Sequence, residues 1–317
     1  MRRVSLTFLS LLVTVGVFAQ RGTCGNGISW KLTDETLTIS GSGEMNDFNS
    51  SDHPSWDVYK DNITKVVVAT GVTKIGTHAF EDYRNLRQIT LNEGVETISE
   101  CAFSGCTGIK ELTLPQSIRV IKGTAFWGLG ISTLTIPEGL ETIEEGAFAA
   151  CEKLTMVKWN AANCSLSSKR DSGPFSSGWN DNFSPVGEVV FGKNVTEIPN
   201  NLFYKCSSLK TVRTSGSISK VGRDAFTDTQ WIDDQPEGIV NIDKALYEYK
   251  GVMTKVASIA IPEGMESITA RVFENCKYLV GITLPTTLKS IGEDSFYGCI
   301  YNHRTTKTNQ KYPSVNL

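Results

Sequence analysis

The three histidines are the side chains best suited to acid–base chemistry, and none of them has a partner at a suggestive spacing. His53 and His303 lie in irregular polar segments, and His78 lies just before Phe80. Hydrolysis would need a nucleophile, a base and an orienting group in defined positions. The sequence contains no HExxH, GxSxG, CxxC or phosphate-binding loop motif. We therefore predict a non-enzymatic protein with no catalytic residue and no cofactor.

Two short polar pairs carry oxygen ligands of the kind that calcium prefers, Asp233–Asp234 and Asn180–Asp181. A calcium loop distributes several such ligands over about a dozen residues. Neither pair has that spacing, so we predict no metal site.

The eight cysteines allow two interpretations. An even number of cysteines in a secreted chain is typical of a disulfide framework. Five of them, however, lie three residues after a recurring phenylalanine, at a position that elsewhere holds Tyr83 or Leu129. That register favours a ladder of free thiols in a packing slot for a small hydrophobe. Cys101 shares the variable position of His78, so we expect it to be exposed. The ladder cysteines are Cys106, Cys151, Cys206, Cys276 and Cys299.

The phenylalanine that sets this register recurs at intervals close to 23 residues. Successive copies are separated by 23, 23, 22, 55, 23, 47 and 23 residues. A fixed period of this length indicates a solenoid of stacked coils. The recurring residues are Phe80, Phe103, Phe126, Phe148, Phe203, Phe226, Phe273 and Phe296.

The coil that ends on Phe148 shows how each repeat is built. Leu134 and Ile136 alternate with Thr135, which predicts a short strand with Thr135 facing solvent. Leu140 and Ile143 form a second inward-facing pair. The phenylalanine and the residue three positions later share one side of a helical or 3₁₀ turn. Each coil is therefore predicted as strand, corner, short turn and helical turn.

Residues 132–154 carry the fullest copy of an Ile-Pro-x-Gly-(Val/Leu)-x-x-Ile-(Gly)-x-x-Ala-Phe-x-x-Cys-x-x-Leu pattern, which resembles the BspA-like leucine-rich repeats of bacterial surface proteins. Residues 22–43, with Trp30, are similar to the capping hairpin of that family. The resemblance implies a leucine-rich-repeat solenoid of the α/β repeat class, with an N-terminal β-hairpin cap. It implies about ten coils of roughly 23 residues, one short strand per coil in a curved parallel sheet, and short helical or 3₁₀ turns opposite. Similar members are associated with adhesion to host proteins or other cells.

The first residues, Met1-Arg2-Arg3, precede an apolar run typical of a secretory signal peptide. No later stretch is suited to span a membrane and no wall-sorting motif is recognisable, so we expect an extracellular or cell-surface protein without an integral span. The predicted regions are a signal peptide at 1–19, a capping region at 20–62, a solenoid at 63–300 with irregular coils at 155–185 and 231–256, and a polar tail at 301–317.

Charge argues against nucleic acid as a partner. Without Arg2 and Arg3 the chain has 29 cationic and 34 anionic side chains, and 29 − 34 gives −5. Extracellular or host proteins are the expected partners, with glycans also possible, and the oligomeric state is not predicted.

The leading hypothesis is a secreted or surface-displayed binding protein of the adhesin type, because a strand ladder of small polar side chains forms an extended face. One alternative is a carbohydrate-binding accessory protein that uses aromatic residues of the irregular coils. Another is a structural, self-assembling surface element. The candidate binding residues are the ladder cations Lys158 and Arg213, with Arg170 and Trp179 from the first irregular coil.

Overall fold

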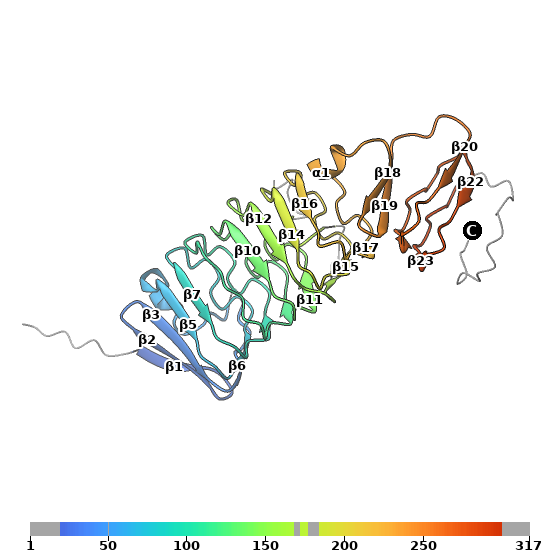
Figure 1. Ribbon diagram of the computed structural model, residues 1–317. Helices are drawn as coiled ribbons and strands as arrows, with labels where there is room; N and C mark the ends of the chain where they lie inside the picture. The colour runs from blue at the N-terminus through green and yellow to red at the C-terminus, as the bar shows by residue number, and fades with distance from the viewer. Residues whose placement is uncertain (1–19, 50, 168–171, 177–183, 300–317) are drawn as a thin grey trace, which may run out of the picture.

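The computed structural model describes residues 20–49, 51–167, 172–176 and 184–299. These residues form one elongated stack of coils, with a β-hairpin cap at its N-terminal end (Figure 1). The cap is an antiparallel meander whose last strand pairs in parallel with the first strand of the stack. Trp30, Leu32, Leu37 and Ile39 face inward from it and are buried. The predicted solenoid and its capping hairpin are both confirmed. The cap strands are β1 (Gln20–Gly25), β2 (Ile28–Thr33) and β3 (Thr36–Gly41).

The strands predicted from the period-2 pattern pair in parallel in three successive groups, β5 with β7, β10 through β16, and β20 with β22, and we call this row of strands the first sheet. Burial alternates along most of them, so that in β10 Leu134 and Ile136 are buried while Thr133 and Thr135 are exposed. This confirms the inside–outside register. The strands are β5 (Lys65–Val68), β7 (Gln88–Leu91), β10 (Thr133–Ile136), β12 (Met156–Trp159), β14 (Glu188–Phe191), β16 (Thr211–Arg213), β20 (Ala257–Ala260) and β22 (Leu279–Thr283).

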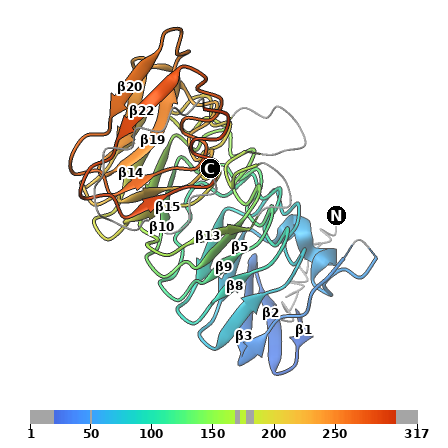
Figure 2. The same ribbon diagram turned by 90° about the vertical axis from the view of Figure 1, so that its right-hand side faces the viewer.

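The structure adds a second short strand to most coils, which the sequence pattern did not indicate. Figure 2 shows β8, β9 and β13 following one another along the stack. Stacking at the spacing of paired strands allows any extended segment to pair with its copy in the next coil, so the second aliphatic pair also becomes a ladder. These strands are β4 (Gly43–Glu44), β6 (Val72–Ile75), β8 (Thr97–Ile98), β9 (Val120–Ile121), β11 (Thr142–Glu144), β13 (Ser165–Ser167), β15 (Glu197–Ile198), β17 (Lys220–Val221), β21 (Ser267–Ile268) and β23 (Ser290–Ile291).

The side opposite the first sheet consists of tight turns, and helix is scarce among the described residues. Each turn is closed by bonds of the 3₁₀ type, such as Ala79 N–H to Gly76 O and Tyr83 N–H to Phe80 O. The helical elements in the described part of the chain are a 3₁₀ helix, η1 (Asp57–Asn62), and one turn of α-helix, α1 (Gln230–Asp233). None of the described helices is long and apolar enough to cross a membrane.

The recurring phenylalanines stack on one another inside the turns. Phe80 to Phe103, Phe103 to Phe126 and Phe126 to Phe148 have ring centroids 5.0, 5.6 and 5.1 Å apart, with nearly parallel planes. Phe175 of the first irregular coil continues the stack, at 6.1 Å from Phe148 and 5.2 Å from Phe203. Phe175 therefore takes the place of an anchor phenylalanine in this irregular stretch, at a position displaced in sequence.

The second irregular stretch is an antiparallel hairpin of β18 (Gly238–Ile242) and β19 (Ala245–Lys250). Counting 23 residues from Phe226 leads to Tyr249, but Tyr249 lies in β19 rather than in a turn. The hairpin continues the second sheet through the pairing of β19 with β21. The apolar core divides at this strand, with Tyr247 in the larger cluster and Leu246 in the smaller one.

Candidate functional site

The outward row of the first sheet holds two of the predicted binding residues. Thr135, Lys158, Val190 and Arg213 lie opposite one another on β10, β12, β14 and β16. Lys158 and Arg213 are exposed and are separated by one strand. Parallel pairing therefore brings residues that are 55 positions apart in sequence onto one flat surface.

The two cations of this row differ in their surroundings. The Arg213 guanidinium donates to the carboxylate of Glu188 on the neighbouring strand, with Nε 2.5 Å from Oε1. The negative charge of Glu188 offsets the positive charge of Arg213 on this surface. Lys158 makes no ion pair within the described part of the chain. Lys158 is therefore the residue of this row that offers a positive charge to a ligand.

The other two predicted binding residues, Arg170 and Trp179, lie outside the described residues. The described part of their coil is packed against its neighbours. Phe175 and Ser176 are buried, and Ser172 donates to the carboxylate of Glu145 over 3.1 Å. This segment closes the coil and does not stand away from it.

The aromatic side chains of the second irregular stretch pack into the stack. Tyr247 is buried, and its hydroxyl accepts a hydrogen bond of 2.8 Å from the backbone N–H of Phe226. Trp231 is half-buried against Phe226, with ring centroids 5.1 Å apart. Tyr249 is half-buried against Phe273. None of these three rings stands free as a platform for a sugar.

The hairpin leaves a cleft of about 470 Å³ on the turn side of the stack. Most turns donate backbone hydrogen bonds to the next turn, as Phe203 N–H does to Ala225 O and Phe273 N–H does to Ser295 O. Between the turn at Phe226 and the turn at Phe273 this ladder is interrupted, because the intervening hairpin supplies no turn. The cleft between them is lined by Arg223, Asp224, Asp228, Glu248, Tyr249 and Arg271. Burial raises the pKa of the Glu248 carboxyl in its wall.

Sequence reasoning did not anticipate this cleft, although the signal was present. The interval of 47 residues between Phe226 and Phe273 is close to twice the period and lacks an anchor phenylalanine. Asp233 and Asp234, considered above as calcium ligands, are exposed at the end of α1, and Asp233 lies at the edge of the cleft. Asn180 and Asp181 lie outside the described residues.

The variable position two residues before each recurring phenylalanine has a fixed backbone conformation. His78, Cys101 and Thr124 there have φ of 54°, 55° and 53°. All eight occupants of the position are left-handed, as are all eight residues two positions after the phenylalanine. At the later position six of the eight are Gly, Asp or Asn, a composition that points to positive φ. The varied residue types at the earlier position, that of His78 and Cys101, predict exposure to solvent. In the structure this position is a corner of the coil, where side chains of successive coils point toward one another.

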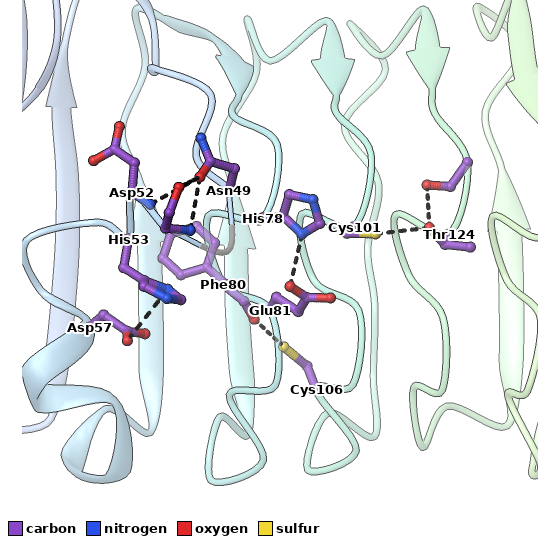
Figure 3. Close-up of polar contacts among 12 residues, drawn as sticks. Asn49, Asp52, His53, Asp57, His78, Phe80, Glu81, Cys101, Cys106 and Thr124 are labelled. Carbon is purple, nitrogen blue, oxygen red and sulfur yellow. Dashed lines mark hydrogen bonds and ion pairs between the residues drawn. The ribbon is translucent and has the colours of Figure 1, made fainter.

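At one such corner three side chains with metal-ligating atoms converge. His78 Nδ1 lies 2.8 Å from Glu81 Oε2, and the ligand atoms of His78, Glu81 and Cys101 all lie within 4.8 Å of one another (Figure 3). All three residues are half-buried. Their meeting was not predicted from the sequence, because Cys101 belongs to the coil that follows His78 and Glu81. His53, by contrast, is largely exposed, and its Nδ1 is 3.9 Å from Asp57 Oδ2.

Cys101 was expected to be exposed, and the structure corrects this. Its side chain is half-buried at the corner, with Sγ 3.1 Å from Thr124 Oγ1. Burial raises the pKa of the Cys101 thiol, and the negative charges of Glu81 and Glu100 add to this shift.

The ladder cysteines pack in the turns and have a hydrogen-bonding role as well. The thiols of Cys106 and Cys151 donate to the carbonyls of Phe80 and Phe126, over 3.1 and 3.4 Å. Burial raises the pKa of each of these two thiols to about 12. Cys276 and Cys299, expected to be buried, are only half-buried. All eight cysteines are free in the structure.

Comparison with known proteins identifies the repeat. The family model described as "BspA type Leucine rich repeat region (6 copies)" matches residues 58–169 and 240–315, which together exceed half of the chain. The chain belongs to this family of BspA-type leucine-rich-repeat proteins. A search of curated proteins found no significant match.

Solved structures of leucine-rich-repeat proteins are similar to this chain at low identity. One is from Eubacterium ventriosum, with 18% identity, a TM-score of 0.42, and 92% of this chain and 98% of that chain covered. Another is from Bacteroides ovatus, with 21% identity, a TM-score of 0.31, and coverages of 87% and 91%. A leucine-rich cell surface protein from Faecalibacterium prausnitzii has 21% identity, a TM-score of 0.42, and coverages of 89% and 74%.

Proposed function

We propose that this chain is a secreted or surface-displayed, non-enzymatic binding protein of the adhesin type, and that it binds through the outward face of the first sheet. The observation that carries the proposal is the register of β10, β12, β14 and β16, which aligns Thr135, Lys158, Val190 and Arg213 in one row. The row spans three strand spacings, about 14 Å in all. Its size and shape suit a partner with an extended or flat surface.

The charge on this face indicates what kind of partner segment it accepts. Lys158 is exposed, while Arg213 is paired with Glu188. A partner carboxylate opposite Lys158 would meet a cation that no described residue of the chain neutralises. Complementary charge of this kind raises the association rate and selects among partners. We therefore expect the bound segment to be a protein segment with an acidic residue near its centre.

Export to the outside of the cell is part of the proposal. Support comes from the basic and apolar pattern of residues 1–19 and from membership of the BspA-type family. The alternative of a carbohydrate-binding protein gains no support from the second irregular stretch, where Tyr247 is buried and Trp231 and Tyr249 are half-buried.

A binding screen against extracellular matrix proteins and glycans, followed by variants of the two faces, tests the proposal. Lys158→Glu is expected to weaken the affinity for a protein partner by at least tenfold, which corresponds to about 1.4 kcal/mol. Arg213→Glu places a carboxylate next to Glu188 and is expected to act in the same direction. Loss of residues 165–183 should also weaken binding, but this deletion removes the buried Phe175 and is expected to lower the melting temperature as well.

The matched control lies on the turn side of the stack. Arg84 is exposed there, with an ion pair of 3.5 Å to Asp82, and Arg84→Glu should leave the affinity unchanged. Arg271 is a less suitable control because it lines the cleft. Binding that survives Lys158→Glu and Arg213→Glu but is lost with a turn-side variant would contradict the assignment of the face. The charge-reversal variants at Lys158, Arg213 and Arg84 should keep the melting temperature of the unchanged protein, since these three residues are exposed.

A further inference from the structure

We propose that His78, Glu81 and Cys101 form a binding site for a divalent transition-metal ion of the zinc type. The site would take one ring nitrogen, one carboxylate oxygen and one thiolate sulfur, with a fourth position left open to water. It lies on the turn side of the first two coils, away from the outward strand face. It is therefore independent of the proposed binding function.

The distances between the side chains suit such a site. Their ligand atoms all lie within 4.8 Å of one another, and His78 Nδ1 and Glu81 Oε2 are 2.8 Å apart. Zinc binds sulfur at about 2.3 Å and nitrogen or oxygen at about 2.0–2.2 Å, so ligand atoms of a tetrahedral site are roughly 3.3–3.8 Å apart. Small side-chain rotations that separate His78 from Glu81 and bring Cys101 closer would reach this geometry.

The same three repeat positions meet at the other end of the stack. There the residues are Arg271, Glu274 and Asp294, with Arg271 Nε 3.8 Å from Glu274 Oε2 and 4.0 Å from Asp294 Oδ2. Convergence of these positions therefore recurs in the fold, and the residue types decide the chemistry. At Arg271 the protein supplies a cation to two carboxylates. At His78 the set consists of an imidazole, a carboxylate and a thiol, each of which carries an atom that can ligate a metal ion.

The backbone holds this corner in place before any ion binds. His78 N–H donates to Glu100 O over 3.1 Å, and Cys101 N–H donates to Gly123 O over 3.3 Å. The adjoining residues Ala79 and Ala102 are fully buried. The two left-handed corners are thus fixed by the turn ladder, and only side-chain rotation is needed for coordination.

A neighbouring hydroxyl suits a coordinated thiolate. Thr124 Oγ1 lies 3.1 Å from Cys101 Sγ and 2.7 Å from Gly123 O. A hydroxyl can turn its proton from a carbonyl to a thiolate, because it is both donor and acceptor. Hydrogen bonds of this kind orient metal ligands and tune the bound ion.

The donor set selects the class of metal. A thiolate with an imidazole favours zinc and related ions over calcium or magnesium, which prefer oxygen ligands alone. Glu81 and a deprotonated Cys101 together supply two negative charges, which balance a divalent ion. Because His78 and Glu81 belong to one coil and Cys101 to the next, the bound ion would join two coils of the stack.

Titration of the reduced full-length protein with Co²⁺ tests the proposal, because a cobalt–thiolate bond gives a charge-transfer absorption that oxygen and nitrogen ligands do not. One equivalent should bind with this absorption, and Zn²⁺ should displace it. Cys101→Ser should abolish the thiolate band, while His78→Asn and Glu81→Gln should each weaken binding at least tenfold. Asn is chosen at position 78 because it tolerates the left-handed conformation. Far-ultraviolet circular dichroism establishes that each variant is folded.

Cys276→Ser is the matched control, since Cys276 is also half-buried and no histidine is among the described residues that line the cleft beside it. This variant should bind Co²⁺ like the unchanged protein. Zn²⁺ should also raise the melting temperature of the unchanged protein and not that of Cys101→Ser, because a ligand that binds only the folded state stabilises it. Absence of a thiolate band, or a band that persists in Cys101→Ser, would overturn the proposal.

Discussion

The stack has two parts that use the same repeat but bury it to different degrees. In the N-terminal stack, residues 63–229, most inward strand residues are buried, and Val66, Val68 and Leu134 are at most 1% exposed, while Leu112 and Val212 are half-buried. In the C-terminal stack, residues 257–299, the equivalent Ile259 and Ile282 are only half-buried. The residue types are alike in the two parts. Residue type alone therefore does not set the burial of an inward position, which also depends on how the coils on either side pack against it.

The thiol ladder follows the same division. Cys106, Cys151 and Cys206 of the N-terminal stack are at most 1% exposed, whereas Cys276 and Cys299 are half-buried. The hairpin of β18 and β19 separates the two parts, and the phenol of Tyr247 takes the place of the carbonyl that a regular turn would have offered to Phe226 N–H. One hydroxyl thus caps the turn ladder of the N-terminal stack.

The largest effect is expected in the middle of the N-terminal stack. Phe148 is fully buried between Phe126 and Phe175, so Phe148→Ala should lower the free energy of unfolding by about 3–5 kcal/mol. Thr135→Ala, on the exposed face of the same coil, should change it by less than about 0.5 kcal/mol. Urea denaturation measures both values. Equal losses would mean that the inside–outside register is wrong.

A smaller effect is expected at the boundary between the two parts. Tyr247→Phe removes the acceptor of the buried Phe226 N–H, and an unsatisfied buried donor costs about 1–3 kcal/mol. Hydrogen exchange should then accelerate at Phe226. Tyr249→Phe is the control, because the Tyr249 hydroxyl has no hydrogen bond among the described residues. If the two variants are equally stable, Tyr247 does not act as a cap.

The buried thiols predict a loss of stability in alkaline solution. Burial raises the pKa of Cys151 from 9.0 to about 12, so the folded state retains a proton that the unfolded state loses. This contribution is fully present below pH 9.0 and decreases as the pH rises toward 12, by roughly 1.4 kcal/mol per pH unit. Unfolding of reduced protein at pH 8 and pH 10.5 should show a smaller difference in Cys151→Ala than in the unchanged protein. If the free energy of unfolding changes equally between pH 8 and pH 10.5 in both proteins, the buried Cys151 thiol does not cause the loss of stability.

The smallest perturbation is chemical labelling, which compares the two parts directly. Iodoacetamide should modify the half-buried Cys276 and Cys299 before the fully buried Cys106, Cys151 and Cys206. Peptide mass spectrometry at successive times gives the order. Modification of all five at one rate would show that the C-terminal stack is as closely packed as the N-terminal stack.

Much of the fold could be predicted from the spacing of residues alone. The phenylalanine period indicated stacked coils, and the alternation around Thr135 indicated which strand residues face solvent. Both are local patterns that every coil repeats, and the structure confirms them. The displaced anchor Phe175 could not be recognised, because its distance from Phe148 and from Phe203 does not follow the period. Only the ring stack identifies it as an anchor.

The candidate sites depended on tertiary structure to a greater degree. Lys158 and Arg213 could be placed on one row from the sequence, but the pairing of Arg213 with Glu188 required the side-chain geometry. The cleft behind β19 exists because the hairpin replaces a turn, which spacing alone does not specify.

The sequence by itself determined the repeat, the inward and outward faces and the family, because these follow from periodic residue types. The meeting of His78, Glu81 and Cys101 was decided only by the tertiary structure. Contacts between coils join residues about one period apart, and the backbone angle at each corner sets the direction of the side chain. The direction of these side chains cannot be read from the residue types at that corner, which vary, or from their separation in sequence.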